Sequence, residues 1–142
     1  MTIQAMLQGR DGAIFNCTTD HNVADAVAIL ADKRIGALPV LDGEKVVGIF
    51  SERDVLHCLE KFGTEAMTKS VAEVMTADVI SVDLQKSVIG ALSLMTKRRI
   101  RHLPVVEGDQ LVAFISIGDL VKYRIDKIES EAAAMRDYIQ SA

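Results

Sequence analysis

The sequence contains few aromatic residues and no tryptophan. Only 4% of its 142 residues are aromatic, whereas 49% are hydrophobic. A chain of this length and apolar content buries enough surface for one compact unit or two closely associated halves. We therefore expect an aliphatic core of Val, Ile, Leu, Ala and Met.

The sequence also lacks targeting and membrane-spanning signals. The first residues do not combine a basic start with an apolar run, and no stretch approaches about 18 consecutive apolar residues, so neither a signal peptide nor a membrane span is predicted. The only two cysteines, Cys17 and Cys58, form neither a disulfide framework nor a metal motif. We expect both to be buried as small apolar residues, in a cytoplasmic protein.

Sequence patterns typical of enzymes are absent as well. There is no Gly-rich phosphate loop, no Cys-x-x-Cys pair, and no nucleophile with a base and an orienting partner at recognisable spacing. His21, His57 and His102 are scattered along the chain and predict no metal site. The net charge of −4 disfavours nucleic acid as a partner. We expect a protein with no catalytic residues, metal or catalytic cofactor.

What the sequence does contain is an internal duplication. Residues 14–56 align without a gap to residues 79–121, at a shift of 65 positions. The identical pairs are Val23/Val88, Ala26/Ala91, Arg34/Arg99, Ile35/Ile100, Leu38/Leu103, Pro39/Pro104, Val40/Val105, Gly43/Gly108, Val47/Val112, Ser51/Ser116 and Asp54/Asp119. Because two copies are too few for a solenoid, we expect them to pair face to face around a pseudo-twofold axis.

Each repeat predicts the element order β-α-β-β-α, hence an α/β fold with helices on one face of the strands. A short strand leads into a helix with apolar residues at helical spacing, and a hairpin of two strands follows. A last helix begins at Ser51 or Ser116, each with Asp three residues later, as in a capping box. The first strands are predicted at 14–17 and 79–82. The helices that follow are predicted to begin at 20–22 and 85–87, and the hairpin turns lie at 42–45 and 107–110.

These patterns divide the chain into five parts. They are an N-terminal segment (1–13), a first repeat domain (14–62), a linker (63–78), a second repeat domain (79–127) and a C-terminal helical extension (128–142). The last helix carries an apolar stripe formed by Ile125, Ile128, Ala132, Met135 and Ile139. Because an isolated chain would expose this stripe, we expect it to pack on the rest of the chain or, preferably, on a second subunit of a homodimer.

The repeated motifs resemble the CBS (cystathionine-β-synthase) domain. The resemblance is carried by Leu-Pro-Val in each repeat, by Gly48-Ile-Phe-Ser-Glu-Arg-Asp54, and by Ala113-Phe-Ile-Ser-Ile-Gly-Asp119. It covers both repeats and is closest to stand-alone bacterial CBS-pair proteins. The resemblance implies a Bateman module whose clefts bind AMP, ADP, ATP, NAD or a similar ligand, with AMP the first expectation. With no enzyme attached, such a module would regulate an unidentified partner in trans.

The chemistry of the Ser-x-x-Asp motif fits this expectation. A carboxylate in the first turn of a helix, from Asp54 or Asp119, can accept hydrogen bonds from ribose hydroxyls. The helix N-terminus and the hydroxyl of Ser51 or Ser116 can bind an anionic phosphate. The alternative is that each Ser and Asp only caps its helix.

The two predicted sites differ. The second repeat has Arg101-His102 where the first has Gly36-Ala37, and the resemblance implies that basic residues here contact phosphate. Arg53 is the candidate of the first repeat, aligned with Gly118, which would let a ligand approach the backbone.

The remaining basic residues allow other interpretations. Arg99 is either a further phosphate contact or a cation at a helix end. The basic cluster of residues 97–102 would otherwise indicate nucleic-acid binding.

The apolar walls and remaining contacts complete the prediction. The base in the Asp119 site is expected against Ile80, Val82, Leu103 and Pro104, and in the Asp54 site against Phe15, Cys17, Leu38 and Pro39. Ala37 and Ile117 are the remaining expected contacts. Ala113, in place of the usual Gly, is expected to narrow its cleft slightly.

The alternative function is a constitutive interaction or scaffold dimer with vestigial clefts, which the C-terminal stripe would support.

Overall fold

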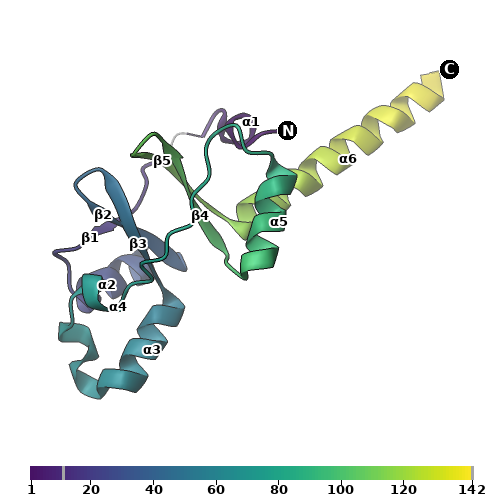
Figure 1. The fold of residues 1–142 in the computed structure, drawn as a ribbon. Helices are drawn as coiled ribbons and strands as arrows, with labels where there is room; N and C mark the ends of the chain where they lie inside the picture. Colours follow the sequence, from purple (N-terminus) through teal and green to yellow (C-terminus); the bar gives the residue numbers. More distant parts are fainter. Residues whose placement is uncertain (11, 142) are drawn as a thin grey trace.

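A computed structural model describes residues 1–10 and 12–141, which form two similar units, each built on a β-hairpin (Figure 1). The elements are α1 (Ile3–Leu7), β1 (Cys17–Thr18), α2 (Val23–Lys33), β2 (Ala37–Asp42), β3 (Lys45–Ser51), α3 (Glu52–Phe62), the 3₁₀ helix η1 (Gly63–Thr68), α4 (Val71–Val74), α5 (Val88–Arg98), β4 (His102–Glu107), β5 (Gln110–Ser116) and α6 (Ile117–Ser141). The predicted α/β class is confirmed.

The two hairpins are close copies. In each, the antiparallel strands meet at a two-residue turn whose glycine has positive φ, 64° at Gly43 and 60° at Gly108. Each hairpin also has a bulge directly after its Leu-Pro-Val motif. The predicted turns are confirmed, and glycine occupies the left-handed position for the expected reason.

The strand that opens each repeat is shorter than predicted. β1 pairs in parallel with β2 through Cys17 and Thr18 only, and the second repeat retains a single parallel bridge between Val82 and Val105. The expected strands over 14–17 and 79–82 are therefore wrong for most of their length. Ile14 and Phe15 line a cleft instead of extending the sheet.

Reciprocal caps fix the starts of the helices. Asn22 and Asp25 form a capping box on α2, and Ser51 and Asp54 form one on α3. The hydroxyl of Ser87 caps α5 by accepting a hydrogen bond from the N–H of Gly90 at 2.9 Å. These side chains accept from N–H groups that have no partner within the helix, which explains why the helices begin where the sequence predicts.

The helices α2 and α5 end in the same unusual way. Arg34 and Arg99, the residues after their last turns, both adopt left-handed conformations with φ of 55°. An L-residue with a side chain is disfavoured in this conformation. The two arginines are therefore held in equivalent, strained positions, each three residues before the strand that follows.

Each repeat is completed by the segment that precedes the other repeat. Helix α1 packs on the second repeat and α4 on the first (Figure 1), with Ile3 and Val71 among the residues of the two cores. The N–H of Ile3 donates to the carbonyl of Lys86 and that of Val71 to the carbonyl of His21, each at 2.9 Å.

This exchange extends the repeat beyond the gap-free alignment. Thr2 forms an antiparallel bridge with Ser87, as Ser70 does with Asn22. The N-terminal segment is therefore repeated at an offset of 68 residues, Ser70 against Thr2. Within the predicted N-terminal segment (1–13), residue 11 lies outside the described residues.

The core consists of two aliphatic clusters, one for each repeat. The first contains Cys17 and Cys58, both buried and not disulfide-bonded, as predicted. Burial raises the pKa of the Cys17 thiol to about 11, so the thiol is uncharged and unreactive at neutral pH. The second cluster is anchored by Leu120, the fully buried residue of α6.

Beyond this anchor, α6 projects from the folded units (Figure 1). The side chains of Ile125, Ile128, Met135 and Ile139 are all exposed. The alternative that the C-terminal stripe packs on its own chain is therefore wrong. Over residues 1–10 and 12–141, no helix combines the length and apolarity needed to cross a bilayer.

Candidate functional site

Two clefts lie between the repeats, and each is lined by residues of both. The larger, which we call the Asp119 cleft, has a volume of about 690 Å³, and the smaller, the Asp54 cleft, about 520 Å³. The Asp119 cleft is lined by Leu7, Arg10, Gly12, Ala13, Ile14, Phe15, Arg34, Ile35, Gly36, Ala37, Leu84, His102, Val112, Ala113, Phe114, Ser116 and Asp119. The Asp54 cleft is lined by Gly36, Ile49, Ser51, Glu52, Arg53, Asp54, Leu56, His57, Thr76, Asp78, Ile80, Arg99, Ile100, Arg101 and His102. Both volumes are in the range of small-molecule sites.

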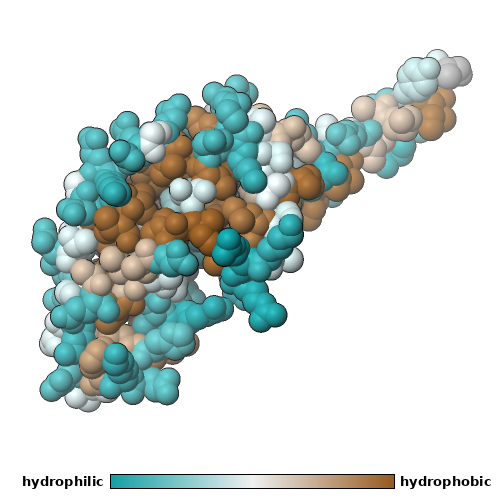
Figure 2. Space-filling model, in the orientation of Figure 1, coloured by the Kyte–Doolittle hydropathy of each residue, from teal (hydrophilic) through white to brown (hydrophobic). Residues whose placement is uncertain are grey.

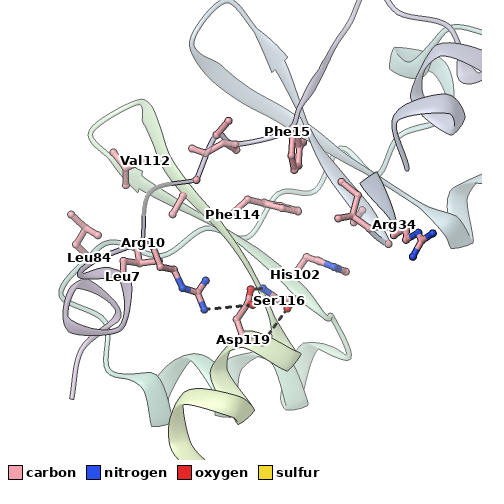
Figure 3. Close-up of a pocket in the computed structure, with 17 residues that line it drawn as sticks. Leu7, Arg10, Phe15, Arg34, Leu84, His102, Val112, Phe114, Ser116 and Asp119 are labelled. Atoms are coloured by element: carbon pink, nitrogen blue, oxygen red, sulfur yellow. Dashed lines mark hydrogen bonds and ion pairs between the residues drawn. The ribbon is translucent and has the colours of Figure 1, made fainter. Parts of the chain in front are cut away.

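In the Asp119 cleft the carboxylate is accessible. The Oδ2 atom of Asp119 accepts the N–H of Ser116 at 2.9 Å, and the Oγ of Ser116 accepts the N–H of Asp119 at 3.1 Å. The Oδ1 atom lies 3.6 Å from Nη2 of Arg10, and the Asp119 side chain remains 35% exposed (Figure 3). One carboxylate oxygen is thus used by the helix cap. The other forms a solvent-exposed ion pair with Arg10, which a ligand can replace.

In the Asp54 cleft the equivalent carboxylate is already occupied by groups of the chain. Its Oδ2 accepts from the N–H of Ser51 at 2.8 Å and from Oγ of Ser51 at 3.1 Å. Its Oδ1 accepts from Oγ1 of Thr76 at 3.1 Å, and the residue is 9% exposed. A ligand hydroxyl that binds Asp54 must therefore displace or share the contact with Thr76.

The cationic side chains are distributed over both clefts. Arg10 and Arg34 line the Asp119 cleft, where Asp119 is the only carboxylate among the described lining residues. The Asp54 cleft is lined by Arg53, Arg99 and Arg101. It is also lined by three carboxylates, those of Glu52, Asp54 and Asp78, so its described positive and negative charges are equal in number. Among its described lining residues the larger cleft thus has two arginines and one carboxylate, a balance that favours an anionic ligand.

His102 lines both clefts and connects them. Its ring is stacked on Phe114, with centroids 5.5 Å apart and an angle of 9° between the planes. Burial lowers the pKa of His102, opposed by the carboxylates of Asp119 and Glu52 and reinforced by the Arg101 guanidinium. The imidazole is therefore neutral near pH 7, with one nitrogen to donate a hydrogen bond and one to accept.

The structure groups the predicted residues differently from the sequence analysis. Arg101 and Ile80, expected beside Asp119, line the Asp54 cleft, and Phe15, expected beside Asp54, lines the Asp119 cleft. Ala37 lines the Asp119 cleft, whereas Ser51, Arg53 and Arg99 line the Asp54 cleft together with Asp54. Phe15 and Ile80 change clefts because the segment that opens each repeat faces the last helix of the other repeat.

Several predicted contacts line neither cleft. Leu38, Leu103, Pro39, Pro104, Val82 and Cys17 are buried in or beside the two cores, Ile117 packs against the second core, and Gly118 is exposed at the start of α6. The Leu-Pro segments therefore shape the strands that carry the clefts.

Of the lining residues that were not predicted, three make side-chain contacts with predicted ones. Arg10, Phe114 and Thr76 contact Asp119, His102 and Asp54, respectively. Arg10 and Thr76 belong to the segments before the gap-free alignment. Aligning Thr2 with Ser70 places Thr76 opposite Gln8, and Arg10 then falls in an insertion of the first repeat.

Ala113 in the second repeat is equivalent to Gly48 in the first, and Met75 lies beside Gly48. A Cβ on Gly48, the equivalent residue, would lie 2.9 Å from Cγ of Met75, so the first repeat needs glycine there. Ala113 lines the Asp119 cleft. Among residues 1–10 and 12–141, no group of three or more His, Cys, Asp or Glu residues is placed to hold a metal ion.

The family model for the CBS domain matches residues 13–61 and 71–126, so both repeats are covered. The chain belongs to the CBS domain family, and its two repeats form a CBS-domain pair, or Bateman module.

Proteins of known sequence share this pair in different contexts. The chain is 34% identical over 135 residues to the mitochondrial CBS domain-containing protein CBSX3 of Arabidopsis thaliana, covering 92% of the chain and 66% of that protein. It is 34% identical over 113 residues to inosine-5′-monophosphate dehydrogenase of Methanocaldococcus jannaschii, covering 78% of the chain and 22% of the enzyme. The chain thus spans less than two thirds of either relative.

Solved structures agree over nearly the whole fold. A putative signal-transduction protein with CBS domains from Burkholderia ambifaria matches with a TM-score of 0.80 and 39% identity, covering 89% of this chain and 95% of the other. CBSX2, solved in complex with AMP, matches with a TM-score of 0.76 and 25% identity, covering 88% and 96%. The CBS pair of MJ0100, solved with 5′-methylthioadenosine and S-adenosyl-L-methionine, shares the fold at 22% identity, with a TM-score of 0.78 and coverage of 89% and 98%. CBS pairs of this fold thus include proteins that bind adenosine derivatives.

Proposed function

We propose that the chain is a non-catalytic regulatory module that binds an adenine nucleotide in the Asp119 cleft. The observation that carries this proposal is the accessible Asp119 carboxylate at the start of α6, in a cleft with an excess of arginine. The AMP complex of CBSX2, a protein of the same fold, supports the ligand class.

The lining residues match the three parts of a nucleotide. The ribose hydroxyls donate to the Asp119 carboxylate, as charge-assisted hydrogen bonds. The base packs against the apolar wall that includes Phe15 and Phe114. The phosphate is bound by the guanidinium groups of Arg34 and Arg10, which are suited to phosphate oxygens.

The Asp54 cleft is proposed as a second, weaker site. Its arginines at 53, 99 and 101 offer phosphate contacts, and Ile80 offers an apolar surface to the base. A ribose hydroxyl must compete there with Thr76 for Oδ1 of Asp54. Breaking that partly buried hydrogen bond reduces the net gain from binding.

Regulation would follow from the position of both clefts between the repeats. A ligand that contacts both repeats stabilises the relative arrangement to which it binds better, in proportion to its difference in affinity. We propose that this change is read in the cytoplasm by a partner protein acting in trans. The IMP dehydrogenase relative, of which this chain matches 22%, shows that CBS pairs also occur within enzymes.

A thermal-shift panel with AMP, ADP, ATP, NAD and S-adenosylmethionine tests the proposal. A ligand at about 100 times its dissociation constant should stabilise the chain by about 2.7 kcal/mol, which raises Tm by roughly 5–10 °C. Asp119→Asn keeps an oxygen for the cap and should abolish most of the shift. Asp54→Asn should leave most of it, and Asp109→Asn, in an exposed hairpin turn, all of it.

A second candidate function is a constitutive interaction dimer whose clefts bind no ligand. The exposed apolar stripe of α6 favours it. A flat panel, with no shift for any of the five ligands, would support this candidate and contradict nucleotide sensing.

A further inference from the structure

The projecting part of α6 carries a continuous line of exposed apolar side chains. It runs through Val121, Ile125, Ile128, Ala132, Met135 and Ile139. Val121 is 41% exposed and Ile139 64%, so exposure persists from the base of the helix to its end. Apolar residues are visible along this projecting helix in Figure 2. A surface of this kind on a free helix is an interaction surface.

The spacing of the line identifies the type of surface. Successive members are four, three, four, three and four residues apart, which is the alternation of a and d positions in a heptad repeat. Ile125, Ala132 and Ile139 occupy a positions, and Val121, Ile128 and Met135 occupy d positions. Such a line is narrower than the apolar face of a helix packed on a globular core, and it suits a helix of the same kind.

The charged residues beside the line distinguish the possible arrangements. Arg124 and Glu131 occupy g positions, and Glu129 and Arg136 occupy e positions. In a parallel pair of helices, each g residue faces the e residue five positions later on the other helix. Arg124 then faces Glu129 of the second copy, and Glu131 faces Arg136. Every such pair is attractive, and symmetry doubles each one.

An antiparallel pair gives the opposite result. The antiparallel register that uses all six apolar residues places Glu129 opposite Glu129 and Glu131 opposite Glu131 of the second copy. It also places Lys122 opposite Arg136, so each of these contacts is repulsive. Within residues 1–10 and 12–141, Arg124, Glu129, Glu131 and Arg136 form no ion pair, which leaves them available to the second copy.

We propose that α6 pairs with α6 of a second copy as a parallel, two-stranded coiled coil. The helix suits this role because its first turns are already fixed by Leu120 in the core. The unfavourable nucleation step is therefore complete before the projecting part finds its partner. The parallel arrangement places both CBS-domain pairs at the same end of the coiled coil.

Sedimentation analysis of the full chain without nucleotide tests the surface. The wild type should have twice the 15.5 kDa mass of one chain. Ile128→Glu should raise the dimer dissociation constant by at least about 100-fold, because it buries a carboxylate from each copy. Ile89→Glu is the matched control, since Ile89 is 53% exposed and Ile128 49%, but Ile89 lies on α5.

Several outcomes would overturn the proposal. They are a monomeric wild type, a dimer unaffected by Ile128→Glu with circular dichroism intact, or a dimer lost in Ile89→Glu instead. Asp119→Asn should leave the dimer unchanged, so failure of nucleotide binding and failure of dimerisation are observed separately.

Disulfide trapping tests the orientation. Ile139→Cys occupies an a position, so in a parallel dimer the two new thiols face each other and crosslink under mild oxidation. Gln140→Cys points away from the partner and should remain largely uncrosslinked. In the antiparallel register, residue 139 lies opposite residue 121, and no crosslink forms. A dimer without the Cys crosslink at 139 would therefore contradict the parallel arrangement.

Discussion

Gly48→Ala provides a direct test of how the segment before the second repeat completes the first. Gly48 is buried in β3, where it pairs with Val40 of β2. A Cβ added to Gly48 would overlap Sδ of Met75 and lie 2.9 Å from its Cγ and 3.1 Å from its Cε. The Met75 backbone is fixed because its N–H donates to the carbonyl of Val71 at 2.8 Å. Only the side chain can therefore move.

The expected cost follows from that movement. Overpacking a buried site costs about 1–3 kcal/mol, and the flexibility of methionine keeps the value in the lower part of this range. Alanine also restricts the unfolded chain, which offsets roughly 0.5 kcal/mol. We expect Gly48→Ala to lower the free energy of unfolding by about 1–2 kcal/mol, and Tm by roughly 3–8 °C.

The assay is chemical and thermal denaturation of a double-mutant cycle. In the Met75→Ala background the space beside Gly48 is empty, so Gly48→Ala should become neutral or slightly stabilising. Gly118→Ala is the control, because its new Cβ would meet only Oγ of Ser116, at 3.6 Å, and should stabilise α6 slightly. If Gly48→Ala destabilises equally with and without Met75, the contact does not explain the glycine.

Three further predictions concern the clefts and the core. Because the pKa of His102 is lowered, the neutral imidazole contributes stability that is present above about pH 6.5 and lost as pH falls through the lowered pKa. Between about pH 7 and 5, the denaturation midpoint should therefore fall less in His102→Gln than in the wild type. An equal dependence of the midpoint on pH in the two proteins would contradict this reasoning. Cys17 and Cys58 should react with a thiol reagent only on unfolding; fast labelling of the native chain would be inconsistent with their burial. Arg10→Gln should weaken AMP binding and strengthen adenosine binding a few-fold, because it removes a cation while releasing Asp119. Calorimetry that shows both ligands changing in the same direction would exclude this dual role.

The sequence predicted the local structure of each repeat well, because caps and turns depend on nearby residues. The Ser51–Asp54 and Ser116–Asp119 pairs form the reciprocal caps expected of them. Gly43 has the positive φ that its hairpin requires. These features are set by contacts within three or four residues, which a single sequence displays directly.

The composition of each cleft could not be predicted in the same way. Arg101 and Asp119 lie in one repeat, yet they line different clefts. No local pattern records which repeat a segment packs against. The pairing of Arg10 with Asp119 depends on an insertion without a counterpart in the second repeat, so alignment of the repeats gave no sign of it.

The left-handed arginines connect the backbone conformation to the charge of both clefts. Arg34 and Arg99 both adopt a conformation that glycine adopts with less strain, by about 1 kcal/mol. Arg34 lines the Asp119 cleft and Arg99 lines the Asp54 cleft. Each strained position therefore brings one guanidinium group to one of the two clefts, and replacing either by glycine would remove a cation together with the strain.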